Sequence, residues 1–201
     1  MRGPAPLPPY VDPAAPSLLR ALPAPRKALF LDRDGVININ HGYVHTPAQT
    51  DWVDGIFDLV AHAQAAGFAL VVVTNQAGIA RGYYDEAGFE RYTRWMHGYF
   101  ARHGTPLLAT YHCPHHPEAG LGELKVARGC RKPAPGMLLQ AARDWEIDLS
   151  RSVLVGDQPS DIEAATRAGA GAAFLLGGAG FGAVMRWLDD QPRSRPAPVS
   201  G

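Results

Sequence analysis

The chain of 201 residues carries 19 basic (Lys and Arg) and 19 acidic (Asp and Glu) residues, and 46% of its residues are hydrophobic. This length is typical of one domain that can bury a full hydrophobic core. The balanced charge gives no net field to attract nucleic acid or an anionic membrane, so we expect neither as a partner.

Proline is concentrated at both ends of the chain. The first 25 residues contain eight prolines and little apolar periodicity, so we expect residues 1–25 to be disordered. They hold no continuous apolar stretch between a basic start and a small-residue cleavage site, which argues against a signal peptide and predicts a cytoplasmic location. Residues 191–201 contain three more prolines and are expected to be equally loose. One folded domain is therefore expected over residues 26–190.

Apolar runs and helical patterns alternate between these ends. Residues 28–31 and 68–73 are nearly continuous apolar runs, as expected of strands buried on both faces. Ile56, Leu59 and Ala63 recur at the spacing of one helix face. By the same criteria, strands are predicted at 107–111, 152–155 and 172–176, and helices over 89–99, 137–145 and 162–168. This alternation predicts an α/β fold: a doubly wound, Rossmann-type parallel sheet with helices on both faces and no large cap domain.

Two further features bear on the compartment. Residues 168–185 carry no charge over a length at which a membrane span becomes a candidate. Six glycines interrupt this segment, so we interpret it as a strand, a glycine turn and a short helix. Cys113 and Cys130, in a chain without an export signal, are expected to be reduced thiols or metal ligands and not a disulfide.

Asp32 and Asp34 directly follow the predicted strand at 28–31. Residues i and i+2 of a strand share a face, so the two carboxylates can converge on one reacting group. Gly35 then allows the chain to turn sharply away. Taken alone, this pattern is equally compatible with an exposed acidic turn. The residues that follow the other predicted strands distinguish the two interpretations.

Three more polar clusters lie beside predicted strand ends or helix starts. Thr74, Asn75 and Gln76 follow the strand at 68–73, residues 156–161 follow the strand at 152–155, and Arg131 and Lys132 precede the helix at 137–145. In a doubly wound sheet these segments share one crevice. Neighbouring carboxylates repel one another unless a hard cation lies among them, and Mg²⁺ takes oxygen ligands while leaving room for a phosphate oxygen. A magnesium site is therefore predicted at this crevice.

This set of motifs resembles the haloacid dehalogenase superfamily of phosphohydrolases, whose four motifs match in order from Asp32 to Asp161. Within it, the chain resembles the heptose 1,7-bisphosphate 7-phosphatase family, with histidinol-phosphate phosphatases as near relatives. The segments that carry the resemblance are residues 32–38, 41–45, 73–82, 113–117 and 130–133. The His-Gly-Tyr-Val-His segment at 41–45 favours the heptose family. The resemblance implies hydrolysis of a sugar phosphate in the biosynthesis of nucleotide-activated heptose, a lipopolysaccharide precursor. Separately from the resemblance, we expect the enzyme to be a monomer.

The resemblance also implies roles for individual residues. Asp32 would be the nucleophile that forms an aspartyl-phosphate, and Asp34 would protonate the leaving alkoxide and then activate water. Mg²⁺ would be held by Asp32, Asp157 and the backbone carbonyl of Asp34, while Thr74 and Lys132 would hold the phosphoryl oxygens. Contacts to the sugar or its second phosphate are implied for Asn40, His41, Gly42, Tyr43, Asn75, Gln76 and Arg131.

Several of these residues have structural alternatives. Thr74 and Asn75 could cap the following helix instead of binding phosphate. Asp161 could be a helix N-cap or a supporting residue of the site instead of a metal ligand. His41 and His45 could pack the loop, and His97, on a predicted helix, is expected to face solvent.

The family pattern breaks at a zinc site. It implies a structural Zn²⁺ held by a Cys-x-His pair and a Cys-x-Cys pair, which Cys113, His115 and Cys130 match. Arg128 occupies the fourth position, and arginine cannot ligate a metal. Structural zinc sites are four-coordinate, so His116, another group or water would have to complete this one, or it stays empty. Gln158 is a second departure, since the heptose family often has lysine there.

Three functions stay open at this point. The leading one is magnesium-dependent hydrolysis of the 7-phosphate of heptose 1,7-bisphosphate. Histidinol phosphate is the alternative substrate. A non-catalytic binding protein of the same fold is the alternative of another class, and the intact set of Asp32, Asp34, Lys132 and Asp157 argues against it.

Overall fold

The computed structural model describes residues 7–178 and 180–191. Its centre is a six-stranded sheet in the order β1-β4-β3-β2-β5-β6. Five strands run parallel: β2 (Lys27–Leu31), β3 (Phe68–Asn75), β4 (Ala109–Cys113), β5 (Val153–Gly156) and β6 (Ala172–Leu175). The short β1 (Tyr10–Val11) pairs antiparallel with β4 at one edge. The predicted α/β class is confirmed, and each predicted strand is present.

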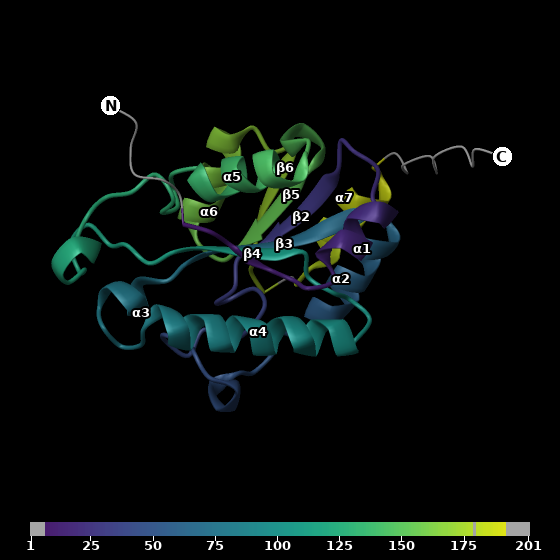
Figure 1. Ribbon diagram of the computed structural model, residues 1–201. Helices are drawn as coiled ribbons and strands as arrows, with labels where there is room; N and C mark the ends of the chain where they lie inside the picture. The colour runs from purple at the N-terminus through teal and green to yellow at the C-terminus, as the bar shows by residue number, and fades with distance from the viewer. Residues whose placement is uncertain (1–6, 179, 192–201) are drawn as a thin grey trace.

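Helices cover both faces of the sheet (Figure 1). The first face carries α2 (Ile56–Ala65), α4 (Glu86–Arg102) and α7 (Gly182–Asp189), and the second carries α1 (Ala15–Ala21), α5 (Gly136–Trp145) and α6 (Pro159–Ala168). A one-turn helix, α3 (Ala77–Ala80), follows β3, and three 3₁₀ turns span Pro47–Gln49, Gly122–Leu124 and Leu149–Arg151. The helices predicted from periodicity are therefore all present.

The strands are apolar throughout because each of their faces meets a different core. In β2, Leu29 and Leu31 belong to the core under α2, α4 and α7, whereas Ala28 and Phe30 belong to the core under α1, α5 and α6. All four side chains are fully buried. A period of two inside a continuous apolar run is the pattern of a parallel sheet covered on both sides.

The expectation of a disordered segment over residues 1–25 is wrong for its described part. Residues 10–11 form β1, and Ala15–Ala21 form α1, whose Leu18 and Leu19 pack against the core. Residues 1–6 and 192–201 lie outside the described residues. Proline content missed this order because the stabilising contacts are with β4 and α4, about a hundred residues away in the chain.

Buried hydrogen bonds attach this N-terminal segment to α4 and β4. His97 of α4 bonds through Nδ1 to Oδ2 of Asp12 at 2.9 Å and through Nε2 to Oγ1 of Thr110 at 2.8 Å. The prediction that His97 faces solvent is therefore wrong, since its side chain is 1% exposed. Asp12 supplies a partner that lets a polar side chain enter the core.

Within the described residues, no helix is long and apolar enough to cross a membrane. The uncharged segment near the C-terminus forms β6 and part of α7, as predicted.

Candidate active site

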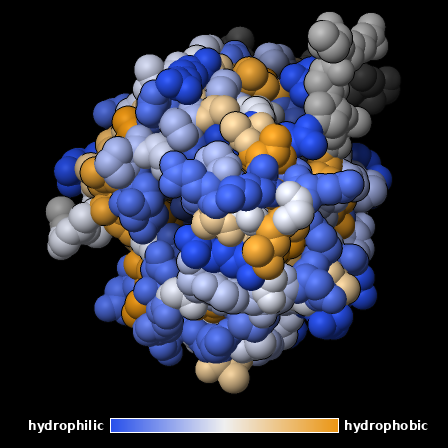
Figure 2. Space-filling view, turned by 90° about the vertical axis from the view of Figure 1, so that its left-hand side faces the viewer, coloured by the Kyte–Doolittle hydropathy of each residue, from blue (hydrophilic) through white to orange (hydrophobic). Residues whose placement is uncertain are grey.

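The polar clusters predicted from the sequence meet where parallel strands end. Asp32 and Asp34 follow β2, Thr74 and Asn75 end β3, and Asp157 follows β5. Their side chains surround a cavity of about 430 Å³. Its lining residues are Asp32, Asp34, Asn40, Gly42, Tyr43, Thr74, Asn75, Gln76, Ala77, Gly78, Tyr84, Arg131, Lys132, Asp157, Gln158 and Ser160. The surface on the side where α3 lies in Figure 1 is mostly hydrophilic, with apolar residues scattered over it (Figure 2).

Lys132 joins two carboxylates at the floor of this cavity. Its ammonium group lies 3.0 Å from Oδ2 of Asp32 and 2.5 Å from Oδ1 of Asp161, and it also donates to the carbonyl of Val73 at 2.8 Å. The side chain is buried, and two carboxylates and one backbone carbonyl surround its ammonium group. Burial alone would lower the pKa of Lys132, but the charges of Asp32 and Asp161 outweigh it and raise the pKa above its usual value. Lys132 is therefore a fixed cation beside the predicted nucleophile.

Three carboxylates form a compact acidic group. Oxygens of Asp32, Asp157 and Asp161 lie within 4.8 Å of one another. Burial raises the pKa of Asp32 to about 6, in spite of Lys132, and burial with the Asp161 charge raises that of Asp157. A divalent cation would relieve this crowding of negative charge, and an all-oxygen set of this kind suits Mg²⁺. The donor set therefore fits the predicted magnesium.

Two glycines allow the acidic group to be so compact. Gly35 has a φ of 89°, and a Cβ there would lie 2.3 Å from Oδ2 of Asp157. A Cβ on Gly156 would lie 2.1 Å from Cβ of Asp161. Both positions must lack a side chain for the carboxylates to approach the strand ends.

Asp161 combines two of the alternatives considered for it. It accepts a hydrogen bond from the backbone N–H of Gln158 at 3.0 Å and so completes the capping box of α6. The same side chain is fully buried and faces Lys132. It is the N3 residue of the capping box, with Gln158 as the N-cap, and at the same time a member of the acidic group.

The Asp34 carboxylate lines the same cavity but is not a member of the acidic group. It accepts hydrogen bonds from Arg33, from Asn38 and, at 3.3 Å, from Gln76. The proposed contact of Mg²⁺ with the backbone carbonyl of Asp34 stays a prediction.

The polar residues after β3 differ in what they offer a ligand. Asn75 exchanges two hydrogen bonds of 3.0 Å with the backbone of Lys132, so its amide holds that loop. Gln76 is 1% exposed and donates to Thr74 and Asp34. Both were predicted to bind substrate, yet their amides are occupied by the protein and position other residues of the site. Neither Thr74 nor Asn75 caps α3, whose N-cap is Gln76 without a side-chain cap.

The rim of the cavity carries aromatic and basic side chains. Tyr43 and Arg131 line it, as do Asn40 and Gly42. His41 is not among the lining residues: its Nε2 lies 2.8 Å from Oδ2 of Asp51, and its substrate contact stays a prediction. The sequence did not indicate the contact between His41 and Asp51, because it depends on the folded conformation of the loop.

Tyr84 is a cavity residue that the sequence reasoning missed. Its hydroxyl donates to Oε1 of Gln76 at 2.5 Å, and its ring stacks on His45 at 4.6 Å between centroids. Burial raises the pKa of Tyr84 to about 12, so the phenol stays neutral at physiological pH. Only the adjacent tyrosine pair at 83–84, after the glycine at 82, could have drawn attention to it.

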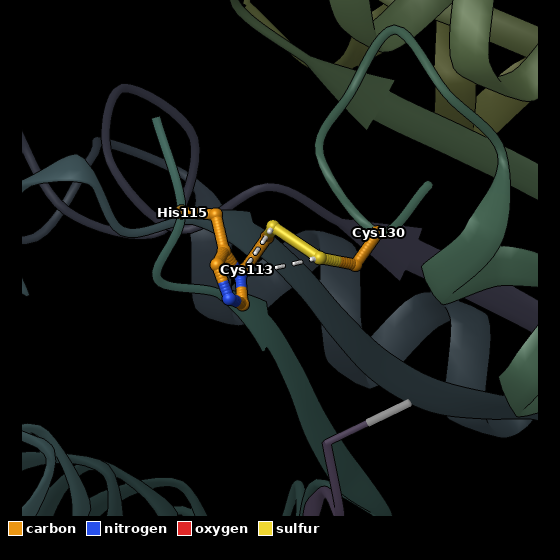
Figure 3. A group of neighbouring side chains, drawn as sticks. All are labelled: Cys113, His115 and Cys130. Carbon is orange, nitrogen blue, oxygen red and sulfur yellow. Dashed lines mark hydrogen bonds between the residues drawn. A yellow bond between two sulfur atoms is a disulfide. The ribbon is translucent and has the colours of Figure 1, made fainter. Parts of the chain in front are cut away.

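The predicted zinc residues converge but are bonded differently. Figure 3 shows Cys113 and Cys130 joined as a disulfide, with Cα atoms 5.5 Å apart, and Nδ1 of His115 lies 3.8 Å and 3.9 Å from their sulfurs. The expectation of reduced thiols is therefore wrong for this structure. The fold brings β4 and residue 130 within the Cα separation that a disulfide requires, which sequence distance did not reveal.

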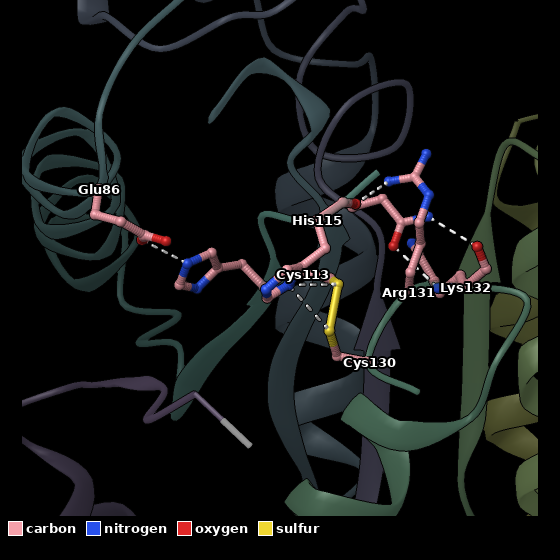
Figure 4. Close-up of a disulfide and its surroundings, with 8 residues drawn as sticks. Glu86, Cys113, His115, Cys130, Arg131 and Lys132 are labelled. Carbon is pink, nitrogen blue, oxygen red and sulfur yellow. Dashed lines mark hydrogen bonds and ion pairs between the residues drawn. A yellow bond between two sulfur atoms is a disulfide. The ribbon is translucent and has the colours of Figure 1, made fainter. Parts of the chain in front are cut away.

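The donor set does not fit a closed structural zinc. Among the described residues only three ligand atoms gather here, and both sulfurs are used in the bond. Nδ1 of His116, the predicted substitute ligand, accepts backbone N–H groups of Glu118 and Ala119. A four-coordinate site needs one more donor, and Arg128 supplies none. The loop remains tied to the active site, because Arg131 donates to the carbonyl of His115 at 3.2 Å (Figure 4).

Comparison with known proteins identifies relatives of this chain. A HAD-hydrolase-like family model matches residues 129–196. The D-glycero-alpha-D-manno-heptose-1,7-bisphosphate 7-phosphatase of Burkholderia mallei is 52% identical over 150 residues, or 75% of this chain and 79% of that protein. The D-glycero-beta-D-manno-heptose-1,7-bisphosphate 7-phosphatase of Vibrio cholerae is 47% identical over 75% of this chain and 81% of its own.

A solved structure shares the fold. The D,D-heptose 1,7-bisphosphate phosphatase from B. bronchiseptica, complexed with magnesium and phosphate, matches with a TM-score of 0.66 and 34% identity, covering 83% of this chain and 88% of that one. The sheet and its acidic site thus define a phosphoric monoester hydrolase of the HAD-like class. Within this class, the chain belongs to the family of D-glycero-D-manno-heptose-1,7-bisphosphate 7-phosphatases.

Proposed function

We propose that this protein removes the 7-phosphate of D-glycero-D-manno-heptose 1,7-bisphosphate in a magnesium-dependent reaction that passes through a phosphorylated Asp32. The observation that carries the proposal is the contact of Lys132 with Asp32 inside an acidic group that fits Mg²⁺. The names of the relatives from Burkholderia mallei and Vibrio cholerae supply the substrate. We place the reaction in the cytoplasm and in the supply of nucleotide-activated heptose, with a monomeric enzyme.

In the first half of the reaction, a carboxylate oxygen of Asp32 attacks phosphorus and the bond to the sugar oxygen breaks. The leaving alkoxide is a poor leaving group, so Asp34 donates a proton to it. Lys132 orients the nucleophile, and its charge lies next to the phosphoryl group that Asp32 receives. The Thr74 hydroxyl, which accepts from Gln76, keeps its own proton free to donate to a phosphoryl oxygen.

In the second half, water attacks phosphorus and the bond to Asp32 breaks. Asp34 accepts the proton of the water, which restores both carboxylates for the next cycle. Held by Asp32, Asp157 and the backbone carbonyl of Asp34, Mg²⁺ would neutralise the charge of the phosphate and of the attacking carboxylate. Asp161, whose carboxylate contacts Lys132 and the backbone N–H of Gln158, would support the site from behind.

The second phosphate of the substrate is assigned to two arginines, Arg131 and Arg81. Arg131 lines the cavity, and burial together with the neighbouring positive charge of Arg81 lowers its pKa. Among the described residues, neither arginine has an acidic partner within ion-pair distance. Two guanidinium groups that repel each other are stabilised by an anion between them, and their planar donors suit phosphate.

Zinc has no part in this proposal. The cluster at Cys113, His115 and Cys130 would close the loop before Arg131 by the disulfide and not by a metal.

A panel of substrates tests the function. Purified protein is assayed with Mg²⁺ on both anomers of heptose 1,7-bisphosphate and on histidinol phosphate, with chelated enzyme as control. We expect the higher kcat/KM on a heptose bisphosphate anomer and loss of activity with chelator. Equal or faster hydrolysis of histidinol phosphate would move the protein to the alternative substrate, and absence of hydrolysis would support the non-catalytic alternative.

A further inference from the structure

Arg33 is a charged side chain that the proposed reaction does not use. It lies between the two catalytic aspartates in sequence, yet it is fully buried. Its guanidinium lies 5.1 Å from the ring centroid of Tyr92, and its Nη2 donates to the carbonyl of Val44 at 2.5 Å. Burying a guanidinium is costly unless its charge and donors are satisfied, so its placement requires an explanation.

The explanation lies in its contact with Asp34. Nε of Arg33 lies 3.2 Å from Oδ1 of Asp34, and Nη2 lies 3.0 Å from Oδ1 and 2.7 Å from Oδ2. The guanidinium fork therefore reaches both carboxylate oxygens. Burial lowers the pKa of Arg33, but the Asp34 charge and hydrogen bond together with Tyr92 and Tyr84 outweigh it, so the guanidinium stays protonated. A fork on both oxygens fixes the plane of the carboxylate as well as its position.

Two amides complete the cradle of Asp34. Nδ2 of Asn38 donates to Oδ1 at 3.0 Å, and Nε2 of Gln76 donates to Oδ2 at 3.3 Å. Gln76 is itself fixed, because its Oε1 accepts from Tyr84 and its Nε2 also donates to Thr74. Asp34 thus has donors on both oxygens from three side chains, of which Arg33 alone carries charge.

We infer that Arg33 is a positioning residue, which orients the Asp34 carboxylate so that it can take the proton of the attacking water. The inference rests on the proposed phosphorylation of Asp32. In this step the water oxygen bonds to phosphorus, the bond between phosphorus and Asp32 breaks with its electron pair returning to Asp32, and the proton passes to Asp34. Without Arg33, the Asp34 carboxylate can still accept a proton, but it is no longer held in the orientation that the water requires. A displacement of about 1 Å can slow a catalytic step by about 100-fold.

Leaving-group dependence separates the two halves of the reaction. With 4-nitrophenyl phosphate, the departing phenolate needs little protonation, so phosphorylation of Asp32 depends weakly on Asp34. Attack of water on phosphorylated Asp32 requires Asp34 as the base for every substrate, because the phosphorylated enzyme is the same in each case. Loss of Arg33 must then slow the second step more than the first.

The experiment measures rapid-quench kinetics of Arg33→Met with 4-nitrophenyl phosphate and Mg²⁺. Methionine fills much of the same volume beside Tyr92 without charge or donors. We expect a burst of nitrophenolate of about one equivalent per chain, a steady state about 10-fold to 100-fold slower than that of the unmodified protein, and phosphorylated Asp32 in acid-quenched samples. Arg94→Met, an exposed arginine on α4 paired with Glu90, is the control and should leave both phases unchanged.

Arg33→Lys keeps the positive charge but replaces the fork by a single ammonium group, so it should show the same pattern with a smaller effect. It provides the test if Arg33→Met fails to fold, as judged by circular dichroism. Equal slowing of the burst and the steady state, or no slowing in a folded variant, would overturn the positioning role. Failure of the proposed function would look different, because the unmodified protein would then form no phosphorylated Asp32.

Discussion

The ammonium group of Lys132 lies 3.0 Å from Oδ2 of Asp32, although 100 residues separate the two in the chain. The contact is buried, and Asp161 shares the same cation. A buried carboxylate with a raised pKa needs such a neighbour to remain ionised near neutral pH, and the proposed role of Asp32 as nucleophile requires the ionised form. The charge state of Asp32 at the end of β2 therefore depends on Lys132 and on the neighbouring carboxylates.

Asp32→Asn is expected to abolish turnover and leave the fold intact. The amide is nearly the same size and still accepts from Lys132, but its oxygen cannot attack phosphorus. The measurement is release of inorganic phosphate from heptose 1,7-bisphosphate, with circular dichroism as the control for folding. Turnover within about 10-fold of the unmodified protein, with contamination excluded, contradicts the assignment of the nucleophile.

Asp34→Asn is expected to lose the acid and base functions while the acidic group stays intact. General acid catalysis typically contributes about 100-fold to 10,000-fold, and a good leaving group needs less of it. The loss of phosphorylation rate should therefore be smaller with 4-nitrophenyl phosphate than with the sugar phosphate, as measured in single turnovers. Equal losses on the two substrates would argue that Asp34 is not the general acid.

Arg131→Met is expected to raise KM for heptose 1,7-bisphosphate by about 10-fold to 100-fold, because a hydrogen bond to a charged group contributes about 1.5–3 kcal/mol. The matched substrate is heptose 7-phosphate, which lacks the 1-phosphate. Its KM should change little in the same variant. A similar rise for both substrates would place Arg131 at the transferred phosphate or at the sugar instead.

Zinc content tests the broken metal site. In protein reduced with a thiol reagent and incubated with Zn²⁺, we expect clearly less than one zinc per chain after dialysis, because a fourth ligand is missing. Arg128→Cys should raise zinc content and the unfolding temperature, since metal binding to the native state adds to folding free energy. One tightly held zinc per chain in the unmodified protein would show that another group completes the site.

Stability should depend on pH through His97. Burial lowers the pKa of His97 below 6.5, although the bond to Asp12 opposes this. Below about pH 6.5 the unfolded chain binds a proton at His97 that the folded protein binds only at lower pH, so the free energy of unfolding must fall as pH falls. The bond to His97 also lowers the pKa of Asp12, which adds a further loss below its usual value of 3.8.

The measurement is urea unfolding at pH 7 and pH 5. His97→Gln, which cannot titrate, should lose less stability between these values than the unmodified protein, and at pH 7 it should be less stable by about 1–3 kcal/mol through weakened bonds to Asp12 and Thr110. His103→Gln, at an exposed position, is the control. An unchanged pH dependence in His97→Gln would contradict the role of His97.

The amino-acid sequence alone predicted the fold class and indicated that Asp32 and Asp157 meet at the strand ends. Apolar runs such as 68–73 and the helical spacing of Ile56 and Leu59 reflect burial, which is a local property of each element. Parallel strands end at the same edge, so polar residues after Leu31 and Val155 had to meet once the topology was known. The substrate family came from resemblance over five short segments and not from periodicity.

Only the tertiary structure decided which partner each polar side chain takes. The bonds of Asp12 to His97, Arg33 to Asp34 through a buried fork, and Cys113 to Cys130 depend on packing and loop geometry, which composition and spacing do not encode. Proline content suggested disorder for residues 7–25, but pairing of β1 with β4 and burial of α1 outweigh it. Long-range contacts stabilise segments that have little local preference, and for that reason they cannot be read from the segments alone.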